Sequence, residues 1–305
     1  MKKLFILILL PVLIGCETVV EIDVPRNRPS LVINSTLNPD SLIHINLSES
    51  RYILDNYDFR YVENASVSVY EDGVLLDTLS HGAEGNYFSS SIKPKRNKDY
   101  QILASASGFV DASAEVLIPK DSITVLSVSI DSVVQNNGFG GYITYQRINV
   151  EMQDNASINN FYSVSLLGEY YYYQYNYDTN PPTLVDSTFV STLEYFNVDD
   201  PYFEDYNSGG TELIFNDELF NGKTYTLRIL NSYYEGDDGF PYSSNPTYTL
   251  LLRNTSESYY LYKNTVSLQS WTSDNPFAQP VQVYTNVTNG YGILSAYNTT
   301  FYKVN

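Results

Sequence analysis

Short runs of alternating apolar and polar residues fill the chain between residues 29 and 119. In ASVSVYE, residues 65–71, hydroxyl side chains alternate with Val67 and Val69, so a strand here has one polar and one apolar face. Turn formers such as Asp72-Gly73 separate the runs. The predicted strands are SLVINSTL, LIHINLS, ASVSVYE, GVLLDTLS, NYFSSSI, DYQILASAS and DASAEVLIP. Seven short strands in about 90 residues predict a β-sandwich of the immunoglobulin-like or transthyretin-like kind.

Longer runs follow Pro119, which ends the last run because proline cannot continue a central strand. They are SITVLSVSI, GYITYQRINVEMQ, NFYSVSLLGEYYYYQYNY, TLVDSTFVSTLEYF, TELIFN, KTYTLRILNSYY and PTYTLLLRN. One helix is expected from Asn254 to Asp274, with Asn254 and Glu257 at capping-box spacing. The last residues read as two more strands about Asn289-Gly290. The expected fold class is therefore all-β, with a sandwich at 29–119 and a larger β-rich domain with one helix at 120–305.

The first 28 residues differ from the rest. A charged start, Met1-Lys2-Lys3, precedes an apolar run from residue 4 to residue 14, and Cys16, the chain's only cysteine, follows. Eleven residues rise about 16 Å as a helix, which is half of a bilayer core, so the run predicts a secretion signal rather than a membrane span. The position of Cys16 resembles a bacterial lipobox, in which cleavage precedes a cysteine that carries a diacylglycerol. We therefore expect a signal peptide at 1–15 and a lipidated tether at 16–28.

Composition narrows the choice of partners. The formal net charge is −18, and loss of Lys2 and Lys3 with the leader makes it −20. Such a chain is a poor partner for nucleic acid or for anionic membrane surfaces. No disulfide is expected, because lipidation would occupy the one thiol, and no cofactor motif occurs, so no cofactor is expected.

Catalytic and metal-binding groups are scarce. The chain has two histidines, His44 and His81, far apart in sequence, and His44 alternates with apolar neighbours, so it should face solvent. A zinc site or a Ser-His-Asp triad would need more converging groups than these. Two acidic runs, DDPYFED (Asp199, Asp200, Glu204 and Asp205) and YEGDDG (Glu235, Asp237 and Asp238), match no EF-hand loop and read as solvated loops rather than a calcium site.

The most unusual run is GEYYYYQYNYD, residues 168–178. In a strand, Tyr171, Tyr173, Tyr175 and Tyr177 would share one face, and Tyr170 and Tyr172 the other. Aromatic faces stack on sugar rings or on the apolar surface of a partner. Packing against neighbouring strands inside a tyrosine-rich sheet is the simpler explanation of the run. Because two adjacent faces are hard to bury together, we expect some of these rings to be exposed.

Asp-Ser/Thr-apolar triplets recur and resemble an O-glycosylation signal of exported bacterial proteins. Their acceptor hydroxyls are Ser41, Thr78, Ser122, Ser132 and Ser187.

The order of these features resembles one family. A lipobox, the run VVEIDVP, a sandwich, a β-rich domain and the terminal NPFAQPVQVYTNVTNGYGILSAY (residues 275–297) are similar to lipoproteins of Bacteroidota gathered under domain of unknown function 4249. The resemblance brings no established activity. It implies an outer-membrane setting, on the cell surface or the periplasmic face, beside TonB-dependent uptake systems.

Two functions are compatible with these patterns. The first is a non-enzymatic, lipid-anchored binding or accessory protein of the outer membrane. Its partners would be the membrane, a TonB-dependent β-barrel, or a glycan or peptide ligand, with Tyr171, Tyr173, Tyr175 and Tyr177 as the contact. The second is a surface glycan hydrolase with a carboxylate pair in the C-terminal domain. A deep acidic pocket after residue 121 would favour the hydrolase, and a flat aromatic face would favour the binder.

Overall fold

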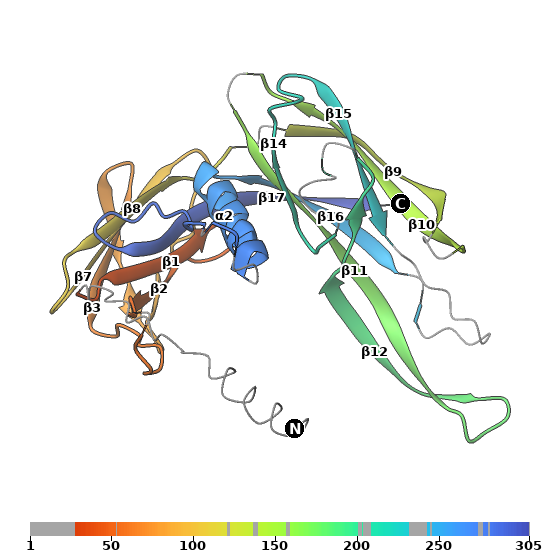
Figure 1. Ribbon diagram of the computed structural model, residues 1–305, viewed down its shortest axis with the longest axis horizontal. Helices are drawn as coiled ribbons and strands as arrows, with labels where there is room; N and C mark the ends of the chain where they lie inside the picture. Colours follow the sequence, from red (N-terminus) through yellow and green to blue (C-terminus); the bar gives the residue numbers. More distant parts are fainter. Residues whose placement is uncertain are drawn as a thin grey trace, which may run out of the picture.

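A computed structural model of the 305-residue chain gives the arrangement of its elements (Figure 1). It describes residues 28–52, 54–120, 123–136, 140–156, 159–200, 203, 209–231, 243–244, 246–273, 277–279 and 281–304. The predicted signal peptide, Cys16 and most of the tether lie outside the described residues.

The predicted all-β class is confirmed, and the described residues contain a single helix. The first region has β1 (Leu31–Leu37), β2 (His44–Glu49), β3 (Ala65–Glu71), β4 (Val74–Thr78), β5 (Ser80–His81), β6 (Asn86–Phe88), β7 (Asp99–Ala106) and β8 (Ala112–Leu117). The second has β9 (Ile123–Asn136), β10 (Tyr142–Asp154), β11 (Phe161–Asn176), β12 (Thr183–Leu193), β13 (Asn197–Val198), β14 (Leu213–Asn216), β15 (Thr224–Asn231), β16 (Thr247–Thr255), α2 (Glu257–Ser273) and β17 (Tyr291–Val304).

Three sheets build the molecule. The largest has nine strands, in the order β12-β11-β16-β17-β1-β2-β6-β5, with β14 also paired to β11. Two four-stranded sheets, β4-β3-β7-β8 and β13-β15-β10-β9, complete it. Figure 1 shows these smaller sheets at opposite ends of the long one, with α2 between the two ends.

The first core lies between β4-β3-β7-β8 and the β1-β2-β6 part of the long sheet. Its members include Ile33, Ile45, Val67 and Ile102, all fully buried, one or two from each facing strand. The alternation of β3 puts Val67 and Val69 in this core and its hydroxyls outside, as predicted. Burying one such side chain stabilises the fold by about 1.5–3 kcal/mol. The immunoglobulin-like or transthyretin-like character of this region stays a prediction.

The second core lies between β13-β15-β10-β9 and the β11-β16 part of the long sheet. Val150 and Ile229 from one sheet meet Val164 and Leu250 from the other, and none of the four is exposed. Several aromatic rings, including Tyr162, Phe215 and Phe220, extend this core, with ring centroids 5.6–6.4 Å apart.

The last strand, β17, belongs to both regions. Its first half, Tyr291 to Ala296, runs parallel to β1, and its second half, Tyr297 to Val304, runs antiparallel to β16. Val287, Leu294 and Ala296 accordingly belong to the first core, whereas Val304 belongs to the second. One strand therefore joins both cores into a continuous sheet. The domain boundary placed at 119/120 stays a prediction, and β17 crosses between the two regions that it would separate.

Gly292 makes this parallel pairing possible. Its φ is +96°, a conformation that side chains with a Cβ rarely adopt. A Cβ there would also collide with the carbonyl oxygen of Ile33 on β1.

Two local predictions were wrong. The last segment does not form two strands: among its described residues, β17 is the only strand, and residues 281–287 join no ladder. Asn286 instead holds that segment, accepting from Leu294 N at 3.0 Å and donating to Leu294 O at 2.8 Å.

The capping residue of α2 is Ser256 rather than Asn254, because Ser256 Oγ accepts from Tyr259 N at 3.2 Å.

Candidate functional site

The β11–β12 hairpin extends beyond the second core, and Figure 1 shows it projecting from the body. The first half of β11 lies inside the long sheet, where Val164 and Leu166 are fully buried. Pairing with β16 ends at Glu169, and β11 then continues against β12 as far as Asn176. Tyr171 N donates to Ser244 Oγ at 2.9 Å and Tyr172 forms an isolated bridge with Ser243; beyond Tyr172, the described pairing of β11 is with β12 alone.

The tyrosine run occupies this distal part. Tyr171 is 50% exposed and Tyr172 is 45% exposed, on opposite faces of the strand. The expectation that some of these rings are exposed is thus confirmed. Tyr173 and Tyr175 are half-buried. Tyr177 is exposed but lies in the turn after β11, so its predicted place on the strand face was wrong.

The partner strand adds apolar groups that the sequence analysis had not linked to the tyrosines. Phe189 of β12 pairs with Tyr171, and the two rings meet edge to face at 5.5 Å. Leu184 and Val185, near the turn, are also exposed. The hairpin from residue 161 to residue 193 contains Glu169, Asp178 and Asp186 but no lysine or arginine. Aromatic groups next to hydroxyls and acids, without cations, suit contact with an apolar, polar or cationic partner.

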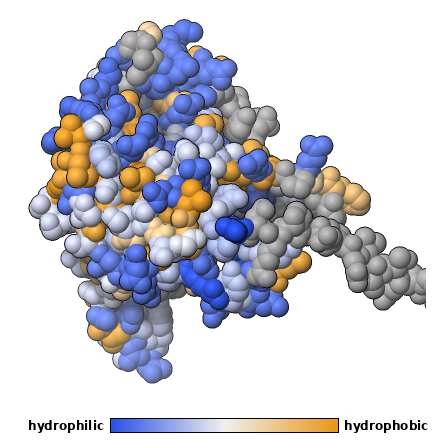
Figure 2. Space-filling model, turned by 90° about the vertical axis from the view of Figure 1, so that its left-hand side faces the viewer, coloured by the Kyte–Doolittle hydropathy of each residue, from blue (hydrophilic) through white to orange (hydrophobic). Residues whose placement is uncertain are grey.

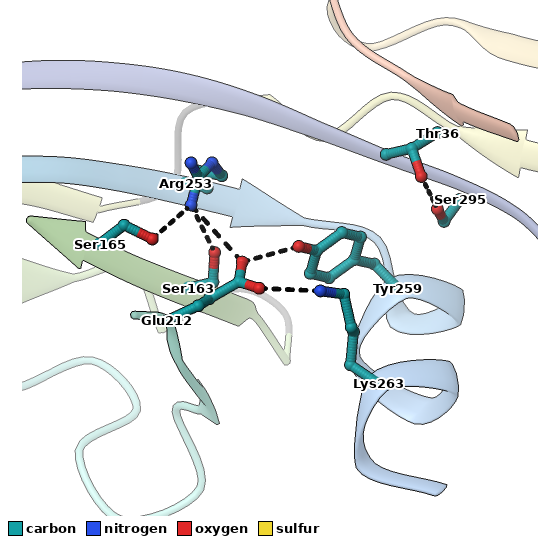
Figure 3. Close-up of polar contacts among 8 residues, drawn as sticks. All are labelled: Thr36, Ser163, Ser165, Glu212, Arg253, Tyr259, Lys263 and Ser295. Carbon is teal, nitrogen blue, oxygen red and sulfur yellow. Dashed lines mark hydrogen bonds and ion pairs between the residues drawn. The ribbon is translucent and has the colours of Figure 1, made fainter. Parts of the chain in front are cut away.

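A second feature is a partly buried charge network beneath α2 (Figure 3). Glu212, just before β14, accepts from Tyr259 Oη at 2.6 Å and from Lys263 Nζ at 2.9 Å, both on α2. Arg253 of β16 lies 3.4 Å from Glu212 and donates to Ser165 Oγ at 3.0 Å. The network ties the helix to the sheet, and no sequence motif had singled it out.

The pKa values follow from this geometry. Burial raises the pKa of Glu212, but the hydrogen bond from Tyr259 and the charge of Lys263 lower it, and the net pKa lies below the usual value. Burial, followed by the charge of Glu212, raises the pKa of Tyr259 far above its ordinary range. Glu212 is therefore a carboxylate held in its charged form, as expected of a structural ion pair.

Paired acids occur in the second region, but they are buried and bonded. Asp154 accepts from Tyr162 Oη at 2.5 Å and from Gly222 N at 2.9 Å. Asp217 accepts from Asn160 N at 2.8 Å and is 1% exposed. Burial raises the pKa of Asp217, and Asp154 raises it further, while hydrogen bonds from Asn160 lower it. These acids hold loops together and offer no surface to a substrate.

A cleft of about 460 Å³ lies where the two regions meet. Its lining comes from the end of the first region, the start of β11 and the start of α2, and includes Glu115, Lys120, Asn160, Phe161, Thr255 and Glu257. Two solvent-exposed carboxylates, Glu115 and Glu257, line this one cavity.

The histidines and acidic runs form no site among the described residues. His44 is exposed, as predicted, stacks on Phe88 at 4.6 Å and contacts Asn86 Oδ1 at 2.8 Å. His81 packs near Tyr87 instead. No group of three or more His, Cys, Asp or Glu side chains that could hold a metal occurs in the described ranges.

Of the acidic runs, two members can be placed. Asp199 lies 3.5 Å from Arg147, and Asp200 accepts from Tyr225 Oη at 2.5 Å. The other members, Glu204, Asp205, Glu235, Asp237 and Asp238, lie outside the described residues, as does Ser122 of the triplets. The remaining triplet hydroxyls, Ser41, Thr78, Ser132 and Ser187, are exposed, and their modification stays a prediction.

These features define a class of β protein. It has two cores, one sheet that runs through both cores, and a projecting aromatic hairpin. The chain belongs to the family described as domain of unknown function 4249, which matches residues 17–303. No curated protein matches it. Among the residues that the structure describes, no helix is both long and apolar enough to cross a bilayer.

Proposed function

We propose that the chain is a lipid-anchored, non-enzymatic binding or accessory protein of the outer membrane, associated with TonB-dependent nutrient uptake. The observation that carries the proposal is the distal β11–β12 hairpin, which exposes aromatic side chains on both faces. Large exposed apolar groups are costly on a free surface unless a partner covers them. Cys16, which follows the apolar leader, supports the anchor, and the family resemblance supports the uptake setting.

The hairpin fits a protein partner by its shape and chemistry. Tyrosine is enriched at interfaces because one ring offers a large apolar area and a polar end. The hairpin reaches out from the body, so its two faces can enter a concave surface such as the mouth of a barrel. Its three acids and lack of cations favour a partner surface that is neutral or basic.

The test compares what co-purifies with two tagged proteins from native membranes. One variant replaces Tyr171, Tyr172, Tyr177 and Phe189, all exposed, with serine. The matched control replaces Leu126 and Val134, exposed to a similar degree on β9, with serine. We expect the first variant to lose its barrel partner and the control to keep it. Each aromatic anchor at a hot spot is worth on the order of 2 kcal/mol.

The anchor has its own test. Cys16→Ser should release the mature protein from the membrane fraction or leave it as precursor, because no acyl chain is attached. Continued sedimentation with membranes after a high-salt wash would contradict the anchor.

The hydrolase alternative would draw on the cleft, where Glu115 and Glu257 line one cavity. It predicts turnover of a glycan by the wild-type protein and loss of that turnover in a Glu115→Gln, Glu257→Gln variant. The binding proposal predicts no turnover by either protein and unchanged co-purification of the barrel.

A further inference from the structure

The chain's only tryptophan lies on the surface. Trp271, in the last turn of α2, is 82% exposed. Leu268, three residues earlier and thus on the same helix face, is 52% exposed, and Phe277 just beyond the helix is 95% exposed. Four residues of chain span at most about 14 Å, so Phe277 stays near the end of α2. We name Leu268, Trp271 and Phe277 the helix-end patch.

The patch lies in a stretch almost without charge. Between residues 264 and 302 the sequence contains one charged side chain, Asp274, although the whole chain carries 17 basic and 35 acidic residues in 305. The nearest preceding cation, Lys263, is engaged with Glu212 at 2.9 Å. The largest cost of moving a protein segment into an apolar phase is the removal of charges from water. This end of the helix carries few charges, so that cost is small.

Some of the polar side chains around the patch form hydrogen bonds within the helix itself. Thr272 Oγ1 donates to Leu268 O at 3.0 Å, and Thr265 Oγ1 donates to Leu261 O at 2.8 Å. Gln269 and Ser270 are uncharged hydrogen-bonding groups on the same part of the helix. Such groups suit a lipid headgroup layer, where an indole ring also sits well because it is apolar with one donor.

The size of the patch favours a lipid surface over a protein. Three side chains expose on the order of 500 Å² at most, since an aromatic residue contributes about 150–250 Å². A stable protein interface needs about 800 Å² from each partner. On the end of the molecule seen in Figure 2, hydrophobic groups form small patches separated by polar ones.

The tether makes contact with lipid possible. Arg28, where the described chain begins, lies twelve positions after Cys16, a stretch of chain that reaches at most about 43 Å. We propose that the helix-end patch inserts into the headgroup region of a zwitterionic membrane and thereby fixes the orientation of the protein on it. This inference rests on the proposed lipid anchor. In Figure 1, α2 lies beside the β17 part of the long sheet, between the two smaller sheets.

Trp271 is itself the probe, because no other tryptophan contributes to the fluorescence. The full lipidated protein is reconstituted into phosphatidylcholine vesicles with or without bromine-labelled acyl chains. We expect a blue-shifted emission maximum and a several-fold loss of intensity with the brominated lipid. Phe277→Ser and Leu268→Ser should each reduce the quenching. Leu75→Ser, at an apolar position on β4 that is 55% exposed, should leave it unchanged.

Vesicle flotation in the same samples separates the two proposals. Protein that floats with the vesicles but is not quenched overturns the insertion and leaves the anchor standing. Protein that does not float overturns both. A blue shift that rises with protein concentration without bromine quenching would identify a second copy as the occupant and likewise overturn the insertion. Added phosphatidylglycerol should weaken the quenching at low salt, because the mature protein, without Lys2 and Lys3, has a net charge of −20.

Discussion

The two regions use their strands differently. In the first, no strand exceeds eight residues among those described, apart from the shared β17, and the longer strands, such as β1 and β7, alternate between core and surface. In the second, β11 has 16 residues, of which the first half covers the core and the second half projects. A core of this thickness needs about five or six residues per strand. We propose that the excess length of β11 and β12 serves contact with a partner rather than stability.

Their charges differ as well. The ion pairs of the first region have an exposed member, such as Lys98 with Asp72, whose side chains are 41% and 45% exposed. In the second, Glu212, Arg253 and Lys263 share one network beneath α2, with the side chain of Glu212 only 17% exposed. Exposed pairs contribute little to stability, whereas breaking a buried one is costly.

The largest effect should come from the strand that the regions share. Deleting residues 291–305 removes β17 from both cores, and we expect no cooperatively folded protein. Replacing residues 172–188 by Asn-Gly removes a similar length from the hairpin and should leave the melting temperature within a few degrees, because those residues cover no core. Near-ultraviolet circular dichroism and thermal denaturation measure both. A cooperative transition in the β17 deletion would show that the first core stands without it.

Two tyrosines of β11, one buried and one exposed, compare the core half of that strand with its projecting half. Tyr162→Ala removes a fully buried ring and should lower the free energy of unfolding by about 3–5 kcal/mol. Tyr171→Ala, on the projecting half of β11, should change it by about 0.5 kcal/mol or less. Urea denaturation gives both values. Equal losses would mean that the distal rings are part of a core and would remove the basis for the proposed contact.

The alternation of apolar and polar residues predicted most of the fold, because a strand with one face on the core and one in solvent has apolar residues at every second position. β3 and β7 were recognisable for this reason, and so was α2 from its apolar spacing, although its capping residue was misassigned. The same pattern misled at residues 281–287, where VQVYTNV reads as a strand but its backbone joins no ladder. The side chain of Asn286 holds that segment by its two hydrogen bonds with the backbone of Leu294. No local sequence pattern reveals such an arrangement.

The candidate sites were predictable to different degrees. The tyrosine run was visible in the sequence, and its four adjacent rings, Tyr170 to Tyr173, cannot all be buried in one strand. Its partner Phe189 depended on a register that only the hairpin fixes. The Glu212 network joins residues 41–51 positions apart, so only tertiary structure brings them together. The sharing of β17 was equally hidden, since nothing in one strand shows that its halves pair with different neighbours.

The smallest of the three effects concerns Glu212. Glu212→Gln keeps the volume of the side chain but leaves Arg253 and Lys263 without their carboxylate, so we expect a loss of about 2–3 kcal/mol at neutral pH. Because the pKa of Glu212 is lower in the folded protein than in the unfolded chain, its contribution is complete above the ordinary glutamate pKa of about 4.3. It is lost as the pH falls through the folded-state pKa. The stability difference between wild type and variant should therefore shrink in acid.

Asp72→Asn in the first region is the matched control. The pKa of Asp72 is also lowered, mainly by its hydrogen bond from Lys98, but its carboxylate is exposed and solvent screens the pair. Urea unfolding between neutral and acidic pH should show a pH-dependent gap for Glu212→Gln and almost none for Asp72→Asn. A gap of the same size in both variants would mean that burial of the network under α2 adds nothing, and that the two regions do not differ in how they use charge.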